Sequence, residues 1–266
     1  MSDIVNLFTF ISYISATSKR LILCFSLPLI FLFLFFSLTR QILPHWTSPS
    51  FVLLLILVAA QLSDKYSVRD NYFIIPKSIV VSLALLFSVL TIGVVEIKTG
   101  FVPLRFTEKS KSVQRFGEGD FTLDMYGRKS IMPEFQQIRS DAVKEGKMDE
   151  SDAMIAMKWF PLAHFDYYVA SPLDMKIFGF GTPEDIHKYA WINKDRGDLE
   201  LGKNYWFITE SSDYYEPNRY LKPYFDEIIP TDTITIERCG KPAKYVFVYM
   251  LKDLKKIPQT WFEEKE

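Results

Sequence analysis

The sequence predicts a membrane α-helical segment of about three spans, residues 1–100, followed by an α/β soluble domain, residues 101–266. Three observations predict this arrangement. Nearly all long apolar runs precede Gly100. Residues 1–100 carry seven Lys and Arg against four Asp and Glu, a formal charge of +3, whereas the remainder carries 24 against 28, a charge of -4. From Asp120 onward, helical and strand-like stretches alternate, which predicts a mostly parallel sheet with a C-terminal antiparallel hairpin.

Three apolar runs are predicted to cross a bilayer. Residues 21–38 form an uncharged run of 18 residues, and residues 78–97 carry a single charge, Glu96. The run between them is shorter, but helical continuation extends it to about residues 48–66. A signal peptide is the alternative for the first run; its length and the lack of a small-residue cleavage site favour retention in the membrane.

Basic residues predict the orientation of these spans, because Lys and Arg are retained on the cytoplasmic side. They precede the first span and lie between the second and third, whereas the loop of residues 39–50 holds only Arg40. This loop and the C-terminal domain are therefore expected to face outward. The inward-facing residues are Lys19, Arg20, Lys65, Arg69 and Lys77.

The soluble part is expected to contain five strands and three helices. Residues 238–242 form a compact Gly- and Pro-containing turn, so the last two strands are expected to pair as a hairpin at one edge of the sheet. The predicted strands are residues 153–159, 175–180, 205–209, 233–237 and 243–251, and the predicted helices are residues 127–147, 182–193 and 216–227.

Composition and motifs exclude several function classes. The weakly acidic soluble part lacks the basic stripe that nucleic-acid phosphates require, so nucleic acid is not expected as a partner. No dinucleotide, Walker or zinc-protease motif occurs, and the three histidines show no metal-ligand spacing. Gly179 and Gly181 lie where an α/β sheet binds phosphate, but a tight strand-to-helix turn explains them better. We therefore expect no metal and no firmly implied cofactor.

Polar residues of the soluble part offer weak candidates for a site. His164 and Asp166 have the chemistry of a base and its orienting partner, although two residues apart on a helix they point to different faces. Asp213 and Tyr214 lie in an aromatic loop after a strand, where a ring can stack on sugar or serve simply as a loop residue. If the soluble domain were a complete enzyme, His164, Asp166 and Asp213 would mark its centre.

The loop between the first two spans holds the remaining candidates. Arg40 is suited to a phosphate, and His45 with Trp46 is suited to a sugar or lipid head group. Snorkelling of Arg40 and interfacial anchoring by Trp46 account for the same residues without any function. Physical chemistry alone favours anchoring.

A resemblance adds to this interpretation. The segments LPHWTSPSFVLLLILVAA, residues 43–60, and DFTLDMYGR, residues 120–128, resemble parts of bacterial relatives of dolichyl-phosphate-mannose protein mannosyltransferases and lipid A aminoarabinose transferases, the glycosyltransferase family 39-like group with GT-C architecture. KWFPLAHFDYYVASPLDMKIFGFG and HKYAWINK follow in the family's order. The resemblance covers most of this chain but only the C-terminal part of the family's length.

The resemblance implies transfer of a sugar from a polyprenyl-phosphate carrier to a cell-envelope acceptor, with a carboxylate as general base. It also implies a multi-pass protein of the bacterial cytoplasmic membrane with a periplasmic C-terminal domain. Family members carry their catalytic acids in the first outer loop, but residues 39–50 contain no Asp or Glu, so no catalytic residue is carried over. We expect the distal part of such an enzyme: a truncated gene product, a domain kept for another purpose, or one half of a split enzyme whose N-terminal membrane half is encoded separately. The alternative is a non-catalytic, membrane-anchored α/β module that binds glycan or an envelope protein.

Overall fold

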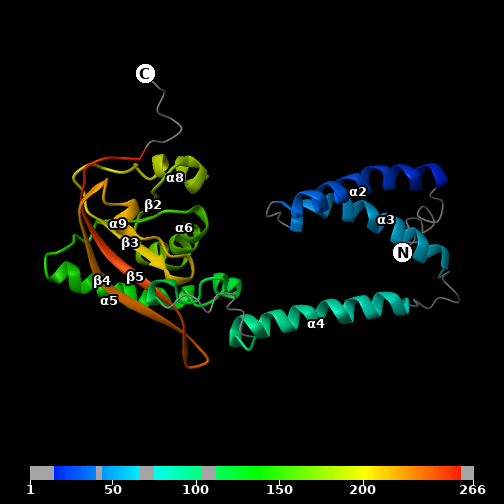
Figure 1. Ribbon diagram of the computed structural model, residues 1–266, viewed down its shortest axis with the longest axis horizontal. Helices are drawn as coiled ribbons and strands as arrows, with labels where there is room; N and C mark the ends of the chain where they lie inside the picture. Colours follow the sequence, from blue (N-terminus) through cyan, green and yellow to red (C-terminus); the bar gives the residue numbers. More distant parts are fainter. Residues whose placement is uncertain (1–14, 40–43, 66–74, 103–111, 259–266) are drawn as a thin grey trace, which may run out of the picture. The chain divides into compact units, whose positions relative to one another are not determined.

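The computed structural model describes residues 15–39, 44–65, 75–102 and 112–258 (Figure 1). Contacts within the chain divide it into two compact units, residues 1–89 and residues 90–266. Each unit is described by itself. The domain boundary expected at residue 100 stays a prediction.

The first unit contains two apolar helices that pack against each other, α2 (Ala16–Ser37) and α3 (Ser48–Lys65). The side chain of Ser15 accepts a hydrogen bond from the Ser18 amide at 3.1 Å, so it supplies the N-cap of α2. The described residues buried in these two helices are small: Ser26, Ser50 and Ala60. Small side chains let helix backbones approach closely in lipid, where no hydrophobic force draws helices together.

A third apolar helix, α4 (Lys77–Thr99), has no buried residue along its 23 residues. Within the described residues, three helices are long and apolar enough to cross a membrane: Ala16–Ser37, His45–Leu62 and Lys77–Thr99. The three apolar helices lie where the sequence predicts them and indicate association with a membrane. The side of the membrane that the soluble domain faces stays a prediction.

The second unit begins with short 3₁₀ turns and continues as a mixed α/β domain. It follows the expected alternation of helix and strand. The helices and the first two strands are shorter than the sequence predicts, whereas the last two strands are longer. The elements are η2 (Val113–Arg115), η3 (Phe121–Met125), η4 (Arg128–Ser130), α5 (Ile131–Lys144), β1 (Ala153–Ala156), α6 (Trp159–Phe165), the π-helix η5 (Asp166–Ala170), η6 (Ser171–Leu173), β2 (Ile177–Gly179), α7 (Pro183–Ile186), α8 (Tyr189–Asp195), β3 (Tyr205–Glu210), η7 (Ser211–Asp213), α9 (Pro217–Tyr220), β4 (Phe225–Arg238) and β5 (Lys241–Leu254).

The five strands form one sheet in the order β2-β1-β3-β5-β4. β1 is parallel to both β2 and β3, while β5 is antiparallel to β3 and to β4. The expectation of a mostly parallel sheet is therefore wrong. The cause is β5, which returns from the hairpin turn and pairs with β3 from Tyr205 to Glu210, so that half of the strand pairings are antiparallel. The predicted hairpin is present, with β4 as the edge strand.

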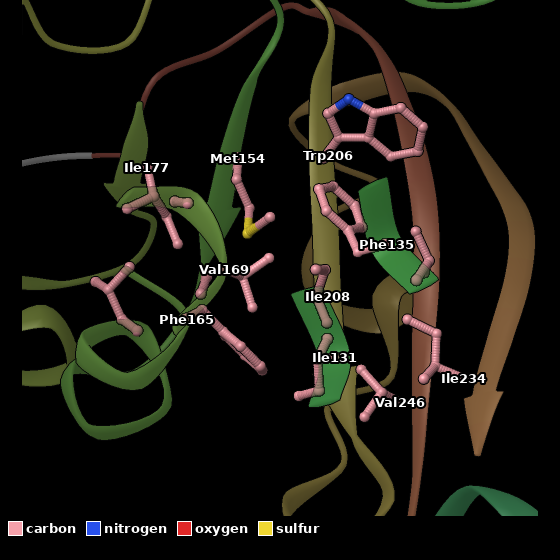
Figure 2. Close-up of a cluster of buried hydrophobic side chains, with 14 of the residues drawn as sticks. Ile131, Phe135, Met154, Phe165, Val169, Ile177, Trp206, Ile208, Ile234 and Val246 are labelled. Carbon is pink, nitrogen blue, oxygen red and sulfur yellow. The ribbon is translucent and has the colours of Figure 1, made fainter. Parts of the chain in front are cut away.

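Both faces of the sheet carry apolar side chains, as the two-residue period of the strands requires. On one face, Ile131 and Phe135 of α5 pack on Trp206, Ile208 and the neighbouring strands (Figure 2). The Phe135 and Trp206 rings meet edge to face with their centroids 5.4 Å apart. The other face is covered around Phe207 by a separate cluster that includes residues after α9. The sheet is therefore buried on both sides.

The helix predicted for residues 127–147 begins later than expected, at Ile131. Gly127 adopts a left-handed φ of 78°, and a Cβ there would overlap the Ile236 side chain. A glycine is therefore required where the chain turns into α5.

The other two predicted helices are also shorter than expected. Residues 182–193 form two helices, because the backbone at His187 has a φ of 50° and interrupts the ladder of hydrogen bonds. Residues 216–227 are helical only as α9, to Tyr220. Pro223 disfavours helical geometry at the residue before it, and the chain enters β4 two residues later.

Replacing Phe135 with alanine tests the packing of α5 on the sheet. The ring is fully buried, so Phe135→Ala is expected to lower the free energy of unfolding of the soluble domain by about 3 to 5 kcal/mol. Lys129→Ala, at an exposed position in η4, is the control and is expected to change it by less than about 0.5 kcal/mol. Guanidinium unfolding of the detergent-solubilised chain, followed by near-ultraviolet circular dichroism, measures both. Equal stabilities of the two variants would contradict this packing.

Candidate functional site

The topology of the sheet marks the carboxyl ends of β1 and β3 as the place for a site. The chain leaves β1 toward β2 on one side and later returns to form β3 on the other side of β1. Ligands of open α/β sheets bind in the crevice that opens where neighbouring strands diverge in this way. Here the crevice is lined by Lys158 and Pro161 after β1 and by Glu210, Asp213 and Tyr215 at the end of β3 and beyond.

A buried ionic cluster lies at the end of β3. Glu210 Oε1 accepts a hydrogen bond from Arg128 Nε at 3.1 Å, and Glu210 Oε2 accepts from Arg128 Nη2 at 3.2 Å. Lys244 Nζ lies 3.0 Å from Glu210 Oε2 and also donates to the Leu123 carbonyl at 3.0 Å. The cluster therefore joins η4, β3 and β5 through one carboxylate.

The cluster is almost completely removed from water. Lys244 is 0% exposed, and Arg128 and Glu210 are also buried. Burial lowers the pKa of Lys244 and the charge of nearby Arg128 lowers it further, while the charge of Glu210 opposes both effects. Arg128 also donates to the Asp124 carbonyl and lies over the Phe160 ring, 5.4 Å from its centroid. Two cations thus share one carboxylate, with backbone carbonyls and an aromatic ring as their other partners.

The rim of the crevice carries a second set of polar groups. Lys158 Nζ lies over the Tyr215 ring, 5.0 Å from its centroid. A hydrogen bond with Tyr215 raises the pKa of Lys158, and desolvation raises the pKa of Asp213. The Tyr215 amide donates to Thr209 Oγ1 at 3.0 Å, which fixes the loop after β3 against the strand. These groups face one another across the mouth of the crevice.

The space between these groups is small. The crevice encloses about 10 Å³, which is room for about one water molecule. Both oxygens of Glu210 are already bonded to Arg128 and Lys244, and the raised pKa of Lys158 keeps its amine charged, so that this lysine is a weak nucleophile. As described, this arrangement stabilises the domain and does not accommodate a sugar-sized substrate.

The structure separates His164 from Asp166. Asp166 accepts hydrogen bonds from the Tyr189 hydroxyl and from Arg196 Nη2, each at 2.8 Å. His164 instead packs between the rings of Phe160 and Tyr168. The two residues point to different partners, as the helical spacing indicates, and the geometry does not bring them together as a catalytic pair.

Tyr214 lies outside the crevice that Asp213 lines. Its hydroxyl lies 3.3 Å from Glu216 Oε2 and 3.3 Å from the Tyr249 hydroxyl. Desolvation raises the pKa of Tyr214, so the phenol stays protonated at neutral pH. With Tyr220 it lines an open hollow of about 380 Å³, together with Ser112, Gln114, Arg115, Glu216 and Arg219.

In the first unit, His45 and Trp46 lie in the short turn η1 (Pro44–Thr47) before α3. The Trp46 ring centroid lies 5.9 Å from that of Phe33 and 6.5 Å from that of His45. Trp46 therefore packs on α2 as an interfacial anchor would. Arg40 lies outside the described residues. Among the residues that the structure describes, no group of His, Cys, Asp and Glu is arranged to hold a metal ion.

Packing explains the glycine at position 179, the last residue of β2. The Asn193 side chain accepts from the Gly179 amide at 2.9 Å and donates to the Gly179 carbonyl at 2.8 Å. A Cβ at Gly179 would lie only 2.9 Å from Tyr189 Cβ. The Gly179 amide is therefore already bonded, and the close approach of α8 accounts for a glycine at this position.

Sequence reasoning missed the buried cluster of Arg128, Glu210 and Lys244. Only Lys244 gave a signal, since it interrupts the apolar run of residues 243–251 at an inward-facing position. Arg128 and Glu210 stand 82 residues apart and resemble ordinary surface charges in the sequence. Their partnership depends on the strand order.

Comparisons with known proteins assign this chain to no group: no family model, no curated protein and no solved structure matches it. The site therefore has to be interpreted from its geometry.

Replacing Glu210 with glutamine tests the buried cluster. The substitution keeps the shape but leaves Arg128 and Lys244 buried without a counter-charge, so a loss of about 3 to 5 kcal/mol in the free energy of unfolding is expected. The matched control is Glu118→Gln, which removes an exposed pair with Arg115 and is expected to cost less than about 1 kcal/mol. If guanidinium unfolding gave the two variants the same stability, the cluster would not stabilise the fold.

His164 offers a test by pH. Burial lowers its pKa and the charges of Arg128 and Lys244 add to the effect, so the folded-state value is expected below the ordinary 6.5 or so. The unfolded chain then binds a proton at a higher pH than the folded chain does, and His164 makes the domain less stable as the pH falls through that window. Nuclear magnetic resonance titration of histidine-labelled chain, with His164→Gln to assign the signal, measures the midpoint. A midpoint above 6.5 would contradict the described surroundings.

Proposed function

We propose that this chain is the distal, acceptor-side part of an integral-membrane glycosyltransferase that uses a polyprenyl-phosphate-linked sugar. In this proposal the apolar helices anchor the chain in the bilayer, and the α/β domain binds the glycan acceptor outside the cytoplasm. The catalytic carboxylate of the transfer is then supplied from outside residues 1–266. The resemblance of residues 43–60 and 120–128 to bacterial GT-C enzymes supports this assignment.

The observation that carries the proposal is the open hollow beside Tyr214 and Tyr220. Its volume of about 380 Å³ falls within the range of about 300 to 1,000 Å³ that small-molecule sites occupy. It combines two tyrosine rings with charged and amide groups from Arg115, Glu216 and Gln114. Aromatic rings stack on the apolar faces of sugars, and such polar groups bond their hydroxyls, so the lining suits a glycan.

The same geometry supports binding over chemistry within this domain. The charged groups at the carboxyl ends of β1 and β3 satisfy one another, and the crevice between them holds about one water molecule. This observation favours, as the second candidate function, a non-catalytic membrane-anchored module that binds glycan or an envelope protein. The two functions share the hollow and differ in whether a catalytic half joins the chain.

Glycan binding to the hollow is tested with Tyr220→Ala. Tyr220 is exposed in the hollow and the Arg219 guanidinium lies over its ring, 5.4 Å from the centroid. Loss of the ring is expected to weaken binding roughly tenfold, equivalent to about 1.4 kcal/mol. Affinities are measured for the full chain in nanodiscs against an array of oligosaccharides that contain hexose and aminohexose.

The matched control is Tyr167→Ala, which removes an exposed tyrosine that does not line the hollow and is expected to leave glycan affinity unchanged. Tyr214→Phe separates stacking on the ring from hydrogen bonding to the hydroxyl, because it keeps the ring and removes the hydroxyl. Unchanged affinity in Tyr220→Ala, or an absence of saturable binding by the unaltered chain, would contradict the assignment of this hollow.

A further inference from the structure

Six aromatic rings form a row on the surface of the soluble domain, which we call the aromatic row. Adjacent ring centroids lie 5.3 Å, 5.6 Å, 4.7 Å, 6.1 Å and 4.9 Å apart along the row. The rings come from α6, the π-helix η5 and the break between α7 and α8. In order, they are His187, Trp159, Phe160, His164, Tyr168 and Tyr167.

The aromatic row is open to the surroundings. Trp159 is 45% exposed and Tyr167 is 71% exposed. At one end, His187 borders a shallow, mainly apolar hollow that Lys188 and Trp191 also line. A contiguous apolar surface of this kind marks an interaction site on a soluble domain. Rings with one apolar body and one polar edge are the residues that concentrate at the boundary between lipid and water.

The end of the third apolar helix lies against this domain. α4 ends at Thr99, and the Lys98 carbonyl lies 3.8 Å from Cys239 Sγ in the hairpin turn. A Cβ at Gly100 would overlap the guanidinium of Arg238, so these two residues are in close contact. The hairpin turn therefore marks the side of the domain where the chain leaves the membrane.

Arg238 connects that turn to an exposed apolar segment. Its Nη2 and Nη1 atoms donate to Asp120 Oδ2 and Thr122 Oγ1, each at 2.9 Å. These two residues begin η3, on which Phe121 is 66% exposed and Met125 is 78% exposed. Large apolar side chains thus stand within a few residues of the contact with the end of the span.

The segment η3 in turn leads to the aromatic row. Arg128 donates to the carbonyl of Asp124 in η3, and the same guanidinium lies over the ring of Phe160 in the row. A series of contacts therefore runs from the end of α4 through the hairpin turn and η3 to the row. The exposed rings and the end of the span belong to the same region of the soluble unit.

We propose that the aromatic row, together with Phe121 and Met125, lies in the headgroup layer of the bilayer that α4 crosses. The domain then rests on the membrane surface, and the rings act as an interfacial belt that fixes its orientation. Continuity with the end of the span selects lipid as the occupant, because this region is held near the bilayer by the chain itself. The inference rests on the membrane anchoring in the proposed function and is independent of sugar transfer.

The test places single spin labels on the full chain in nanodiscs of phosphatidylethanolamine and phosphatidylglycerol. Cys24 and Cys239 are first replaced by serine, and one cysteine is then introduced by Met125→Cys, Tyr167→Cys, Glu145→Cys or Leu85→Cys. Collision of each label with oxygen reports lipid, and collision with a water-soluble nickel chelate reports water. Glu145 follows α5 at the end remote from η4, about 20 Å along the helix, and is the water-exposed control. Leu85, in α4, is the lipid control.

The labels at Met125 and Tyr167 are expected to show an oxygen-to-nickel ratio at least threefold higher than that at Glu145. Ratios equal to that at Glu145, with a lipid-like label at Leu85, would overturn the proposal. A water-like label at Leu85 would overturn the membrane anchoring on which the proposed function depends. This result differs from failure of the aromatic-row proposal alone, in which Leu85 stays lipid-like. If soluble oligosaccharides shield the Tyr167 label from nickel as strongly as the bilayer does, the row is a glycan surface and the proposal is wrong.

Discussion

Glu210 ends β3 with a carboxylate that contacts two buried cations, Arg128 at the start of the α5 segment and Lys244 on β5. Burying these three charges in isolation would be strongly unfavourable, so each depends on the others and on nearby carbonyls. The chain segments that carry them are therefore held in one arrangement: η4 beside β3, and β3 beside β5. The same contacts fill the end of the sheet where an α/β domain would otherwise place a ligand, and the crevice there has room for about one water molecule.

Much of the fold follows from local sequence pattern. The three apolar helices and the five strands overlap the apolar runs that predict them, because burial in lipid or in a sheet core selects such residues directly. β4, however, begins at Phe225, eight residues before its predicted start and within a predicted helix. The pairing of β5 with β3 depends on contacts between distant segments, so periodicity alone did not reveal a mixed sheet. The predicted helices were too long for local reasons: Pro223 follows α9, and the left-handed backbone of His187 separates α7 from α8.

Among the candidate residues too, features set by local sequence were predictable and features set by distant contacts were not. His164 and Asp166 have separate partners, as their spacing on a helix indicates, and Gly179 serves close packing with α8. Tyr214, chosen because it follows a strand in an aromatic loop, does line an open hollow. The ionic cluster was not predictable, since Arg128 and Glu210 meet only after the sheet has formed. The aromatic row was hidden for a similar reason, because its rings come from three elements.

These features combine into a membrane-anchored chain whose soluble domain presents a glycan-sized hollow and an aromatic surface, while its buried charges serve stability. We propose that this chain binds the acceptor and that residues 1–266 do not carry out the transfer by themselves. The most direct measurement is transfer of radiolabelled sugar from a polyprenyl-phosphate carrier to an oligosaccharide by the purified full chain in liposomes. We expect saturable oligosaccharide binding and no sugar transfer by the chain alone. Transfer at an enzymatic rate by the chain alone would contradict it.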